Sequence, residues 1–190
     1  MSTSDQAVAA SPLSKMQAVG GEMTLVELPR CGKLSLRGEP SDAAFVAACE
    51  QVLGVAPQAT LAPPQHVDTG TLFWIGPNEW LLHCADELTA QLQQQLQQVA
   101  EGAHMAVVDV SDYYVLVRLE GDDARAVLSR GTPLDMHAKA FKVGEAVSTR
   151  FAKCSVLIHA QSDNCFDVQV RWSHAEYLWQ FIAQAASQYG

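Results

Sequence analysis

The stretch Thr71-Leu-Phe-Trp-Ile-Gly-Pro-Asn-Glu-Trp-Leu-Leu-His83 indicates the fold most clearly. Two apolar runs flank a Gly-Pro-Asn turn, which predicts a β-hairpin. Similar short apolar runs occupy residues 24–28, 33–37, 105–109, 115–120, 147–151, 156–160 and 166–171. Single helical patterns separate these groups of strands. The order therefore favours an α+β fold, with antiparallel-rich mixed sheets and packed helices, over a doubly wound parallel sheet.

Three of the helices are predicted by capping residues and by apolar spacing. Ser41 is expected to cap the first helix, and Gly54 to end it. Asp86 is expected to cap the second, in which leucines recur at helical spacing as far as Val99. The third is a compact helix within residues 121–131.

The C-terminal helix has the strongest start signal. Ser173 and Glu176 match a capping box, and Trp172 with Tyr177 occupies the positions of a hydrophobic staple. This pattern predicts a helix that begins at Ser173, with Leu178, Phe181, Ile182 and Ala185 along one face.

The domain organisation is simple. Residues 1–22 are small and polar, without the charged and apolar regions of a signal peptide, and are expected to form a disordered tail. Residues 23–190 are expected to form a single domain, in which a weak two-half symmetry suggests units 23–104 and 105–190. Residues 55–70 are expected to be a loop.

The composition limits the possible partners and compartments. Twelve Lys and Arg against 21 Asp and Glu give a formal charge of −9, which argues against nucleic acid and against anionic membrane surfaces. No apolar stretch approaches the roughly 20 residues of a spanning helix. The five cysteines are scattered and form no Cys-x-x-Cys pair, which fits reduced thiols in the cytoplasm.

Motifs for catalysis, cofactors and metals are absent from the sequence. It contains neither a Gly-rich phosphate loop nor the Gly-x-Ser-x-Gly and His-Glu-x-x-His motifs. His83 and Cys84 are adjacent, but neighbours on a strand point to opposite faces. No catalytic residue, no metal site and no cofactor site are therefore expected in this chain.

Two groups of residues remain candidates for binding. Asp109 and Ser111 would share a face at the end of a strand, although Asp and Ser in a turn commonly accept backbone hydrogen bonds instead. The four tryptophans could form a ligand wall, but tryptophans among leucines are more typical of a core or a subunit interface.

Several sequence motifs, taken in order, resemble those of the sarcosine oxidase gamma subunit family. They are Leu72-Phe-Trp-Ile-Gly-Pro-Asn-Glu-Trp-Leu-Leu82, Val108-Asp-Val-Ser-Asp112, Leu119-Glu-Gly-Asp-Asp-Ala-Arg125, Gly131-Thr-Pro-Leu-Asp-Met-His137, and Ser173 to Trp179. The resemblance covers nearly the whole chain beyond the tail. It implies a fold similar to the folate-binding domain of the glycine-cleavage aminomethyltransferase.

The same resemblance implies a role in sarcosine catabolism. In such complexes the partners are the alpha, beta and delta subunits, and FAD, FMN, NAD and tetrahydrofolate belong to these partners. They oxidise sarcosine to glycine, with hydrogen peroxide and formaldehyde or methylenetetrahydrofolate. The gamma chain would be non-catalytic. Residues His159 to Cys165 do not match the aminomethyltransferase turn that carries a catalytic carboxylate, which argues against methylene transfer by this chain.

The leading hypothesis is an interaction subunit that docks on its partners through apolar side chains. The interface candidates are Trp74, Trp80 and the segment from Leu134 to Phe141. The alternative is a stand-alone folate-binding or aminomethyltransferase-like protein that holds a pterin with Asp109, Asp112 or Arg171. The spacing of the cysteines relative to other residues does not support a hydrolase or redox enzyme that uses a cysteine.

Overall fold

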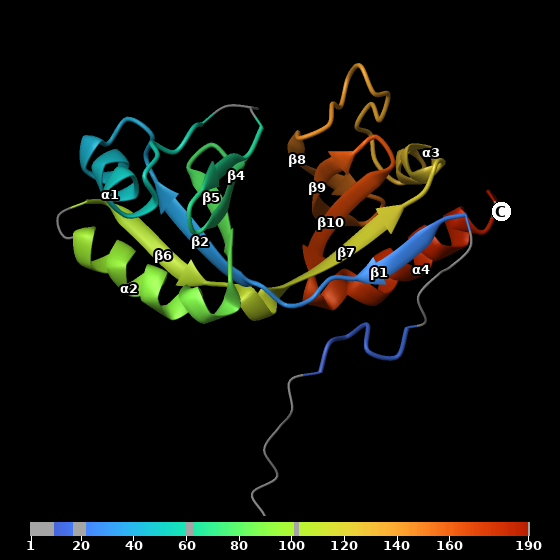
Figure 1. The fold of residues 1–190 in the computed structure, drawn as a ribbon, viewed down its shortest axis with the longest axis horizontal. Coiled ribbons are helices and arrows are strands. Elements are labelled where there is room, and N and C mark those ends of the chain that lie inside the picture. Colours follow the sequence, from blue (N-terminus) through green and yellow to red (C-terminus); the bar gives the residue numbers. More distant parts are fainter. Residues whose placement is uncertain (1–9, 17–21, 60–62, 101–102, 190) are drawn as a thin grey trace, which may run out of the picture.

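Two five-stranded sheets, each covered by helices on one face, form the protein (Figure 1). The computed structural model describes residues 10–16, 22–59, 63–100 and 103–189. The first sheet has the order β3 (Gln65–Val67), β4 (Gly70–Gly76), β5 (Glu79–Cys84), β2 (Gly32–Gly38), β6 (Met105–Asp109). The second has the order β1 (Thr24–Glu27), β7 (Tyr114–Glu120), β10 (Cys165–Arg171), β9 (Cys154–Ser162), β8 (Ala146–Phe151).

The predicted fold class is confirmed. All eight strand pairs of the described residues are antiparallel, so the sheets are not mixed in direction. The helical elements are α1 (Ala43–Leu53), η1 (Asp86–Leu88), α2 (Thr89–Val99), η2 (Ser111–Tyr113), α3 (Ala124–Ser129), η3 (Trp172–His174) and α4 (Ala175–Ala186). None of the helices in the described part of the chain combines the length and hydropathy of a bilayer crossing.

The two halves exchange strands. β1 pairs with β7 in the second sheet, where Leu25 lies opposite Leu119, whereas β6 pairs with β2 in the first sheet. The chain therefore crosses between the halves twice, before β2 and again at η2 (Figure 1). The predicted boundary between residues 104 and 105 consequently does not separate the two sheets.

The hairpin predicted from Thr71 to His83 is confirmed as β4 and β5, with Trp74 opposite Trp80. Because side chains alternate along a strand, Trp80 and Leu82 face α1 and α2, while His83 faces the other sheet. The centroid of the Trp80 ring lies 5.2 Å from the centroid of the Phe45 ring of α1. The hairpin thus contributes to the first core on one face and to the boundary between the sheets on the other.

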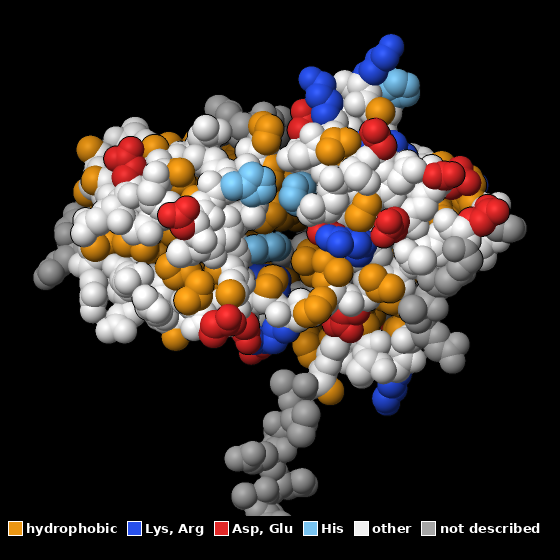
Figure 2. All heavy atoms as spheres, viewed as in Figure 1, with side chains coloured by type: hydrophobic (Ala, Val, Ile, Leu, Met, Phe, Trp, Pro, Cys, Tyr) orange, Lys and Arg blue, Asp and Glu red, His pale blue; other side chains and the backbone are white. Residues whose placement is uncertain are grey.

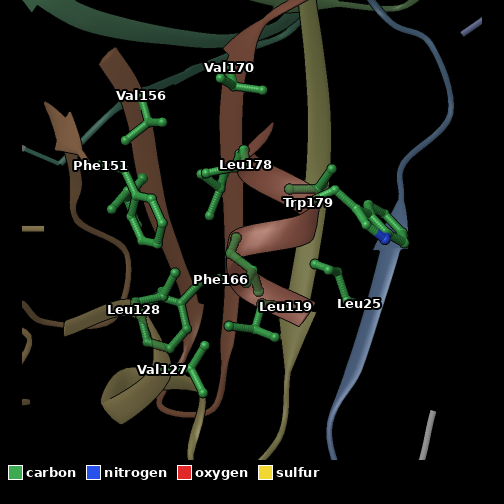
Figure 3. Close-up of a cluster of buried hydrophobic side chains, with 14 of the residues drawn as sticks. Leu25, Leu119, Val127, Leu128, Phe151, Val156, Phe166, Val170, Leu178 and Trp179 are labelled. Carbon is green, nitrogen blue, oxygen red and sulfur yellow. The ribbon is translucent and has the colours of Figure 1, made fainter. Parts of the chain in front are cut away.

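The second core lies between its sheet and the helices α3 and α4 (Figure 3). Phe166 and Val170 of β10 contribute to it, as does Leu178 of α4, and all three are 0% exposed. Burying a side chain of this size stabilises the fold by about 1.5–3 kcal/mol. Two separate helix-covered cores leave the opposite faces of both sheets free to meet each other.

The predicted helix starts were wrong in detail. Asp42, not Ser41, caps α1 by accepting a hydrogen bond from the Ala44 amide at 2.9 Å. Gly54 ends that helix with a left-handed φ of 77°, as predicted. The Asp86 carboxylate pairs with Arg30, and a turn of 3-10 helix precedes α2.

The C-terminal helix also begins differently. η3 occupies the position expected for the capping box, and α4 begins at Ala175 without a side-chain cap. Trp172 is 42% exposed, so it is not held as a buried staple. The 3-10 turn uses backbone hydrogen bonds where the sequence offered side-chain ones.

Three further expectations need correction. Within the predicted disordered tail, residues 10–16 are described, and Leu13 is 3% exposed against the second core. Residues 1–9 and 17–21 lie outside the described residues. Within the predicted loop 55–70, the short strand β3 pairs with β4, and residues 60–62 are not described. The third helix is shorter than expected, because α3 ends at Ser129.

Candidate functional site

The candidate site is the boundary where the uncovered faces of the two sheets meet. Along β2, the alternating polar residues Lys33, Ser35 and Arg37 face the second sheet, while the leucines between them face the helices. A hydrogen bond of 2.6 Å between His83 Nε2 and Gln169 Oε1 joins the two sheets directly. The boundary therefore combines polar contacts with a small apolar cluster, in which Phe73 and Leu81 of the first sheet pack with Leu157 of the second.

Two hollows lie along this boundary. The larger, of about 550 Å³, includes Arg37, Glu79 and Arg171 in its lining. The smaller, of about 180 Å³, has three histidines in its lining. Leu157 and Gln169 line both hollows and separate them. Figure 2 shows histidine side chains gathered in the recess between the two halves.

The three residues predicted for a folate pocket do not converge. The Asp109 carboxylate accepts hydrogen bonds from the Ser111 amide and hydroxyl at 2.9 and 2.5 Å. Asp112 is 80% exposed and pairs with Arg30 at 2.9 Å. Arg171 lines the larger hollow, whereas both aspartates lie outside it.

The turn interpretation of Asp109 and Ser111 is confirmed. Ser111 is 4% exposed, and its hydroxyl also accepts a hydrogen bond from the Lys33 amide at 2.9 Å. These contacts fix η2 against the start of β2. The aspartate and serine therefore shape the crossing between the sheets.

The smaller hollow brings together residues that lie far apart in the sequence. His83 of β5 and His159 of β9 both contact the Phe73 ring, with centroid distances of 4.7 and 5.4 Å. The Asp167 carboxylate of β10 accepts hydrogen bonds from Nε and Nη2 of Arg118, at 2.7 and 2.9 Å. Only the strand order brings these residues together. The alternation Asp167-x-Gln169-x-Arg171 in the sequence does indicate a polar face on this strand.

The two histidines are neutral at neutral pH. Burial lowers the pKa of His83 to about 4, and the nearby Lys33 ammonium lowers it further. Burial also lowers the pKa of His159, although the Asp167 carboxylate opposes this effect. The hollow therefore holds the two neutral imidazoles of His83 and His159 and a carboxylate that is paired with Arg118.

Burial acts against activation of four of the five thiols. Burial raises the pKa of Cys49 to about 12, and it also raises those of Cys84, Cys154 and Cys165. These thiols are protonated at neutral pH and are poor nucleophiles. No group of three His, Cys, Asp or Glu among the described residues is placed to hold a metal ion.

The predicted interface residues divide into two groups. Trp80 and Phe141 are each 1% exposed within the cores, so their prediction as interface residues was wrong. Trp74 and Leu134 are half-buried at the edges of the cores and remain predictions. The large apolar side chains that are most exposed are instead Val108, Tyr113, Val143 and Trp172.

Comparison with known proteins gives consistent matches along the chain. Residues 37–188 match the sarcosine oxidase, gamma subunit family. The sarcosine oxidase subunit gamma of Corynebacterium sp. (strain U-96) is 30% identical over 174 residues, covering 90% of this chain and 83% of the relative. That of Corynebacterium sp. (strain P-1) is 27% identical over 191 residues, covering 99% and 93%.

Solved structures give the same result. A chain of the heterotetrameric sarcosine oxidase from Corynebacterium sp. U-96, in complex with pyrrole 2-carboxylate, superposes with a TM-score of 0.84. The identity is 27%, and 95% of each chain is covered. The glycine cleavage system aminomethyltransferase T from Bartonella henselae, at 14% identity and a TM-score of 0.62, covers 83% of this chain and 44% of its own. This second likeness concerns the fold alone.

Proposed function

The chain belongs to the sarcosine oxidase, gamma subunit family, and from this membership we propose that it works as a non-catalytic subunit of a heterotetrameric sarcosine oxidase. The observation that carries the proposal is the end-to-end superposition on a chain of such an oxidase, at a TM-score of 0.84 over 95% of both chains.

The chemistry of the chain supports a non-catalytic role. Burial raises the pKa of the buried cysteines, so these thiols are protonated at neutral pH. The three candidate pterin-binding residues, Asp109, Asp112 and Arg171, do not line one common pocket. Catalysis needs groups of matched pKa held around one reacting centre. We therefore assign the oxidation of sarcosine to the partner subunits.

The proposed partners are the alpha, beta and delta subunits, with FAD, FMN, NAD and tetrahydrofolate bound by those chains. The proposed reaction converts sarcosine to glycine, with hydrogen peroxide and formaldehyde or methylenetetrahydrofolate as products. The scattered cysteines, which form no Cys-x-x-Cys pair, favour a cytoplasmic complex. These assignments follow from the family and are open to direct test.

The stand-alone folate-binding alternative has one observation in its favour, the hollow of about 550 Å³ between the sheets. A pterin site also requires polar groups that converge on the ligand. Asp109 and Asp112 are engaged elsewhere, so the subunit role is the better explanation.

Omission of this chain from the complex tests the proposal. The larger oxidase subunits of the same host are co-produced with and without it, and complex size, flavin absorbance and sarcosine-dependent hydrogen peroxide are measured. We expect a complex that contains this chain, and loss of its stability or yield without it. A complex that never contains the chain would contradict the proposal. Tight tetrahydrofolate binding by the lone chain would then favour the alternative.

A further inference from the structure

Three of the four exposed large apolar side chains of the described residues lie around η2. Val108 is 53% exposed, Tyr113 45% and Trp172 42%, and the fourth exposed large apolar residue, Val143, lies outside this group. Tyr113 and Trp172 flank the turn at Ser111 and Asp112. We call the surface formed by Val108, Tyr113, Arg171 and Trp172 the η2 ridge. Exposed aromatic and arginine side chains together are typical of interface hot spots.

The η2 ridge is held rigidly. The Val110 amide donates to the Lys33 carbonyl at 2.9 Å, and the Tyr113 amide donates to the Val110 carbonyl at 3.0 Å. The Tyr113 ring meets the Tyr114 ring edge-on, with a centroid distance of 4.8 Å. Because little conformational freedom remains to be lost, binding at this surface costs less entropy than binding at a flexible loop.

A hollow lies on each side of the ridge. One is the hollow of about 550 Å³ between the sheets, which Val108, Tyr113 and Arg171 help to line. The other, of about 400 Å³, lies beside Trp172 and Asp112. A protrusion between two hollows offers a partner both apolar anchors and places for its own side chains.

Arg171 gives the surface a charge preference. Its guanidinium lies 5.2 Å above the centre of the Tyr113 ring, and no carboxylate in the described part of the chain pairs with it. The neighbouring arginines differ, because Arg30 pairs with Asp86 and Asp112, and Arg37 pairs with Glu79. In a chain of charge −9, an exposed arginine without a carboxylate is suited to an acidic group on another molecule.

We propose that the η2 ridge is the surface through which this chain docks on a larger protein subunit, with Arg171 facing a carboxylate of that subunit. The inference rests on the proposed function and deepens it, because it names the surface and the chemistry of the partner. The partner presents an apolar patch for Tyr113 and Trp172 and an acidic residue beside it.

A competition experiment within the complex tests this inference. Tagged variant and untagged wild-type chains are co-produced with the partner subunits, and mass spectrometry measures their ratio in the purified complex. Arg171→Glu and Val108→Asp are expected to reduce incorporation at least about tenfold. Thermal melting of each purified variant shows whether it folds, and Trp172→Ser provides a third change at the η2 ridge.

The chain contains matched controls. Arg130 is also exposed, with its guanidinium 5.0 Å above the Tyr189 ring and no carboxylate partner among the described residues. Val143 is 50% exposed, close to the value for Val108. Neither residue belongs to the η2 ridge. Arg130→Glu and Val143→Asp are expected to change incorporation less than twofold.

The outcomes separate this inference from the proposed function. If the wild-type chain enters the complex and folded Arg171→Glu and Val108→Asp enter it equally well, the η2 ridge is not the docking surface. The proposed subunit role would then remain intact. Failure of the wild-type chain to enter any complex would overturn both. A wild-type homodimer that Val108→Asp dissociates, with partner incorporation unchanged, would assign the surface to a second copy instead.

Discussion

The ion pair between Arg118 and Asp167 is expected to be a major stabilising contact between β7 and β10. Both guanidinium contacts are short, at 2.7 and 2.9 Å, and the Asp167 side chain is only 10% exposed. Replacing Arg118 with Met would leave a buried carboxylate without its cation. Removing one partner of a buried pair costs roughly 3–5 kcal/mol. Because the Arg118 side chain is 35% exposed and solvent screens it, we expect about 3 kcal/mol.

Urea unfolding followed by circular dichroism measures this cost. With a slope of about 2 kcal/mol/M, Arg118→Met should lower the midpoint by about 1.5 M. Arg37→Met is the matched control, because its pair with Glu79 at 3.0 Å is 65% and 28% exposed and should contribute less than about 1 kcal/mol. Adding Asp167→Asn to Arg118→Met should recover part of the loss. Equal midpoints for the two single variants would refute the reasoning.

Three further predictions concern stability. The pKa of His83 falls from 6.5 to about 4 on folding. The free energy of unfolding should therefore decline by up to about 3 kcal/mol as pH falls from 6.5 to 4, because the unfolded chain binds a proton that the folded chain does not. His83→Gln should flatten this decline in urea titrations at pH 7 and 4.5. Gly131→Ala would place its Cβ 2.3 Å from the buried Phe151 ring and should lower the free energy of unfolding by about 2–3 kcal/mol in the same assay. A urea midpoint equal to that of the wild type would contradict this packing. Asp42→Ala removes the α1 cap and should cost about 1 kcal/mol, and Asp42→Asn should restore most of it.

Local patterns in the sequence predicted most of the secondary structure. The alternation and turn residues between Thr71 and His83 were sufficient for the hairpin, and Gly54 for the end of α1, because both features depend on neighbouring residues. The starts of α2 and α4 were less predictable. In each case a 3-10 turn, which is common at helix ends, takes the place of the expected side-chain cap.

The candidate site depended on information that local patterns do not contain. β1 joins the second sheet although it precedes β2 in the chain, and no local signal specifies this exchange. The meeting of His83 with Gln169 follows from the strand order and from contact between the two sheets. Trp80 shows the limit of composition, because the same residue type serves a core and an interface, and only its burial against Phe45 decides.

Affinity purification of the tagged chain from its own host grown on sarcosine tests the central claim most directly. Mass spectrometry identifies the chains that co-purify, and absorbance measures bound flavin. The account predicts a yellow complex that contains larger subunits and oxidises sarcosine. A colourless chain that purifies alone under these conditions would contradict it.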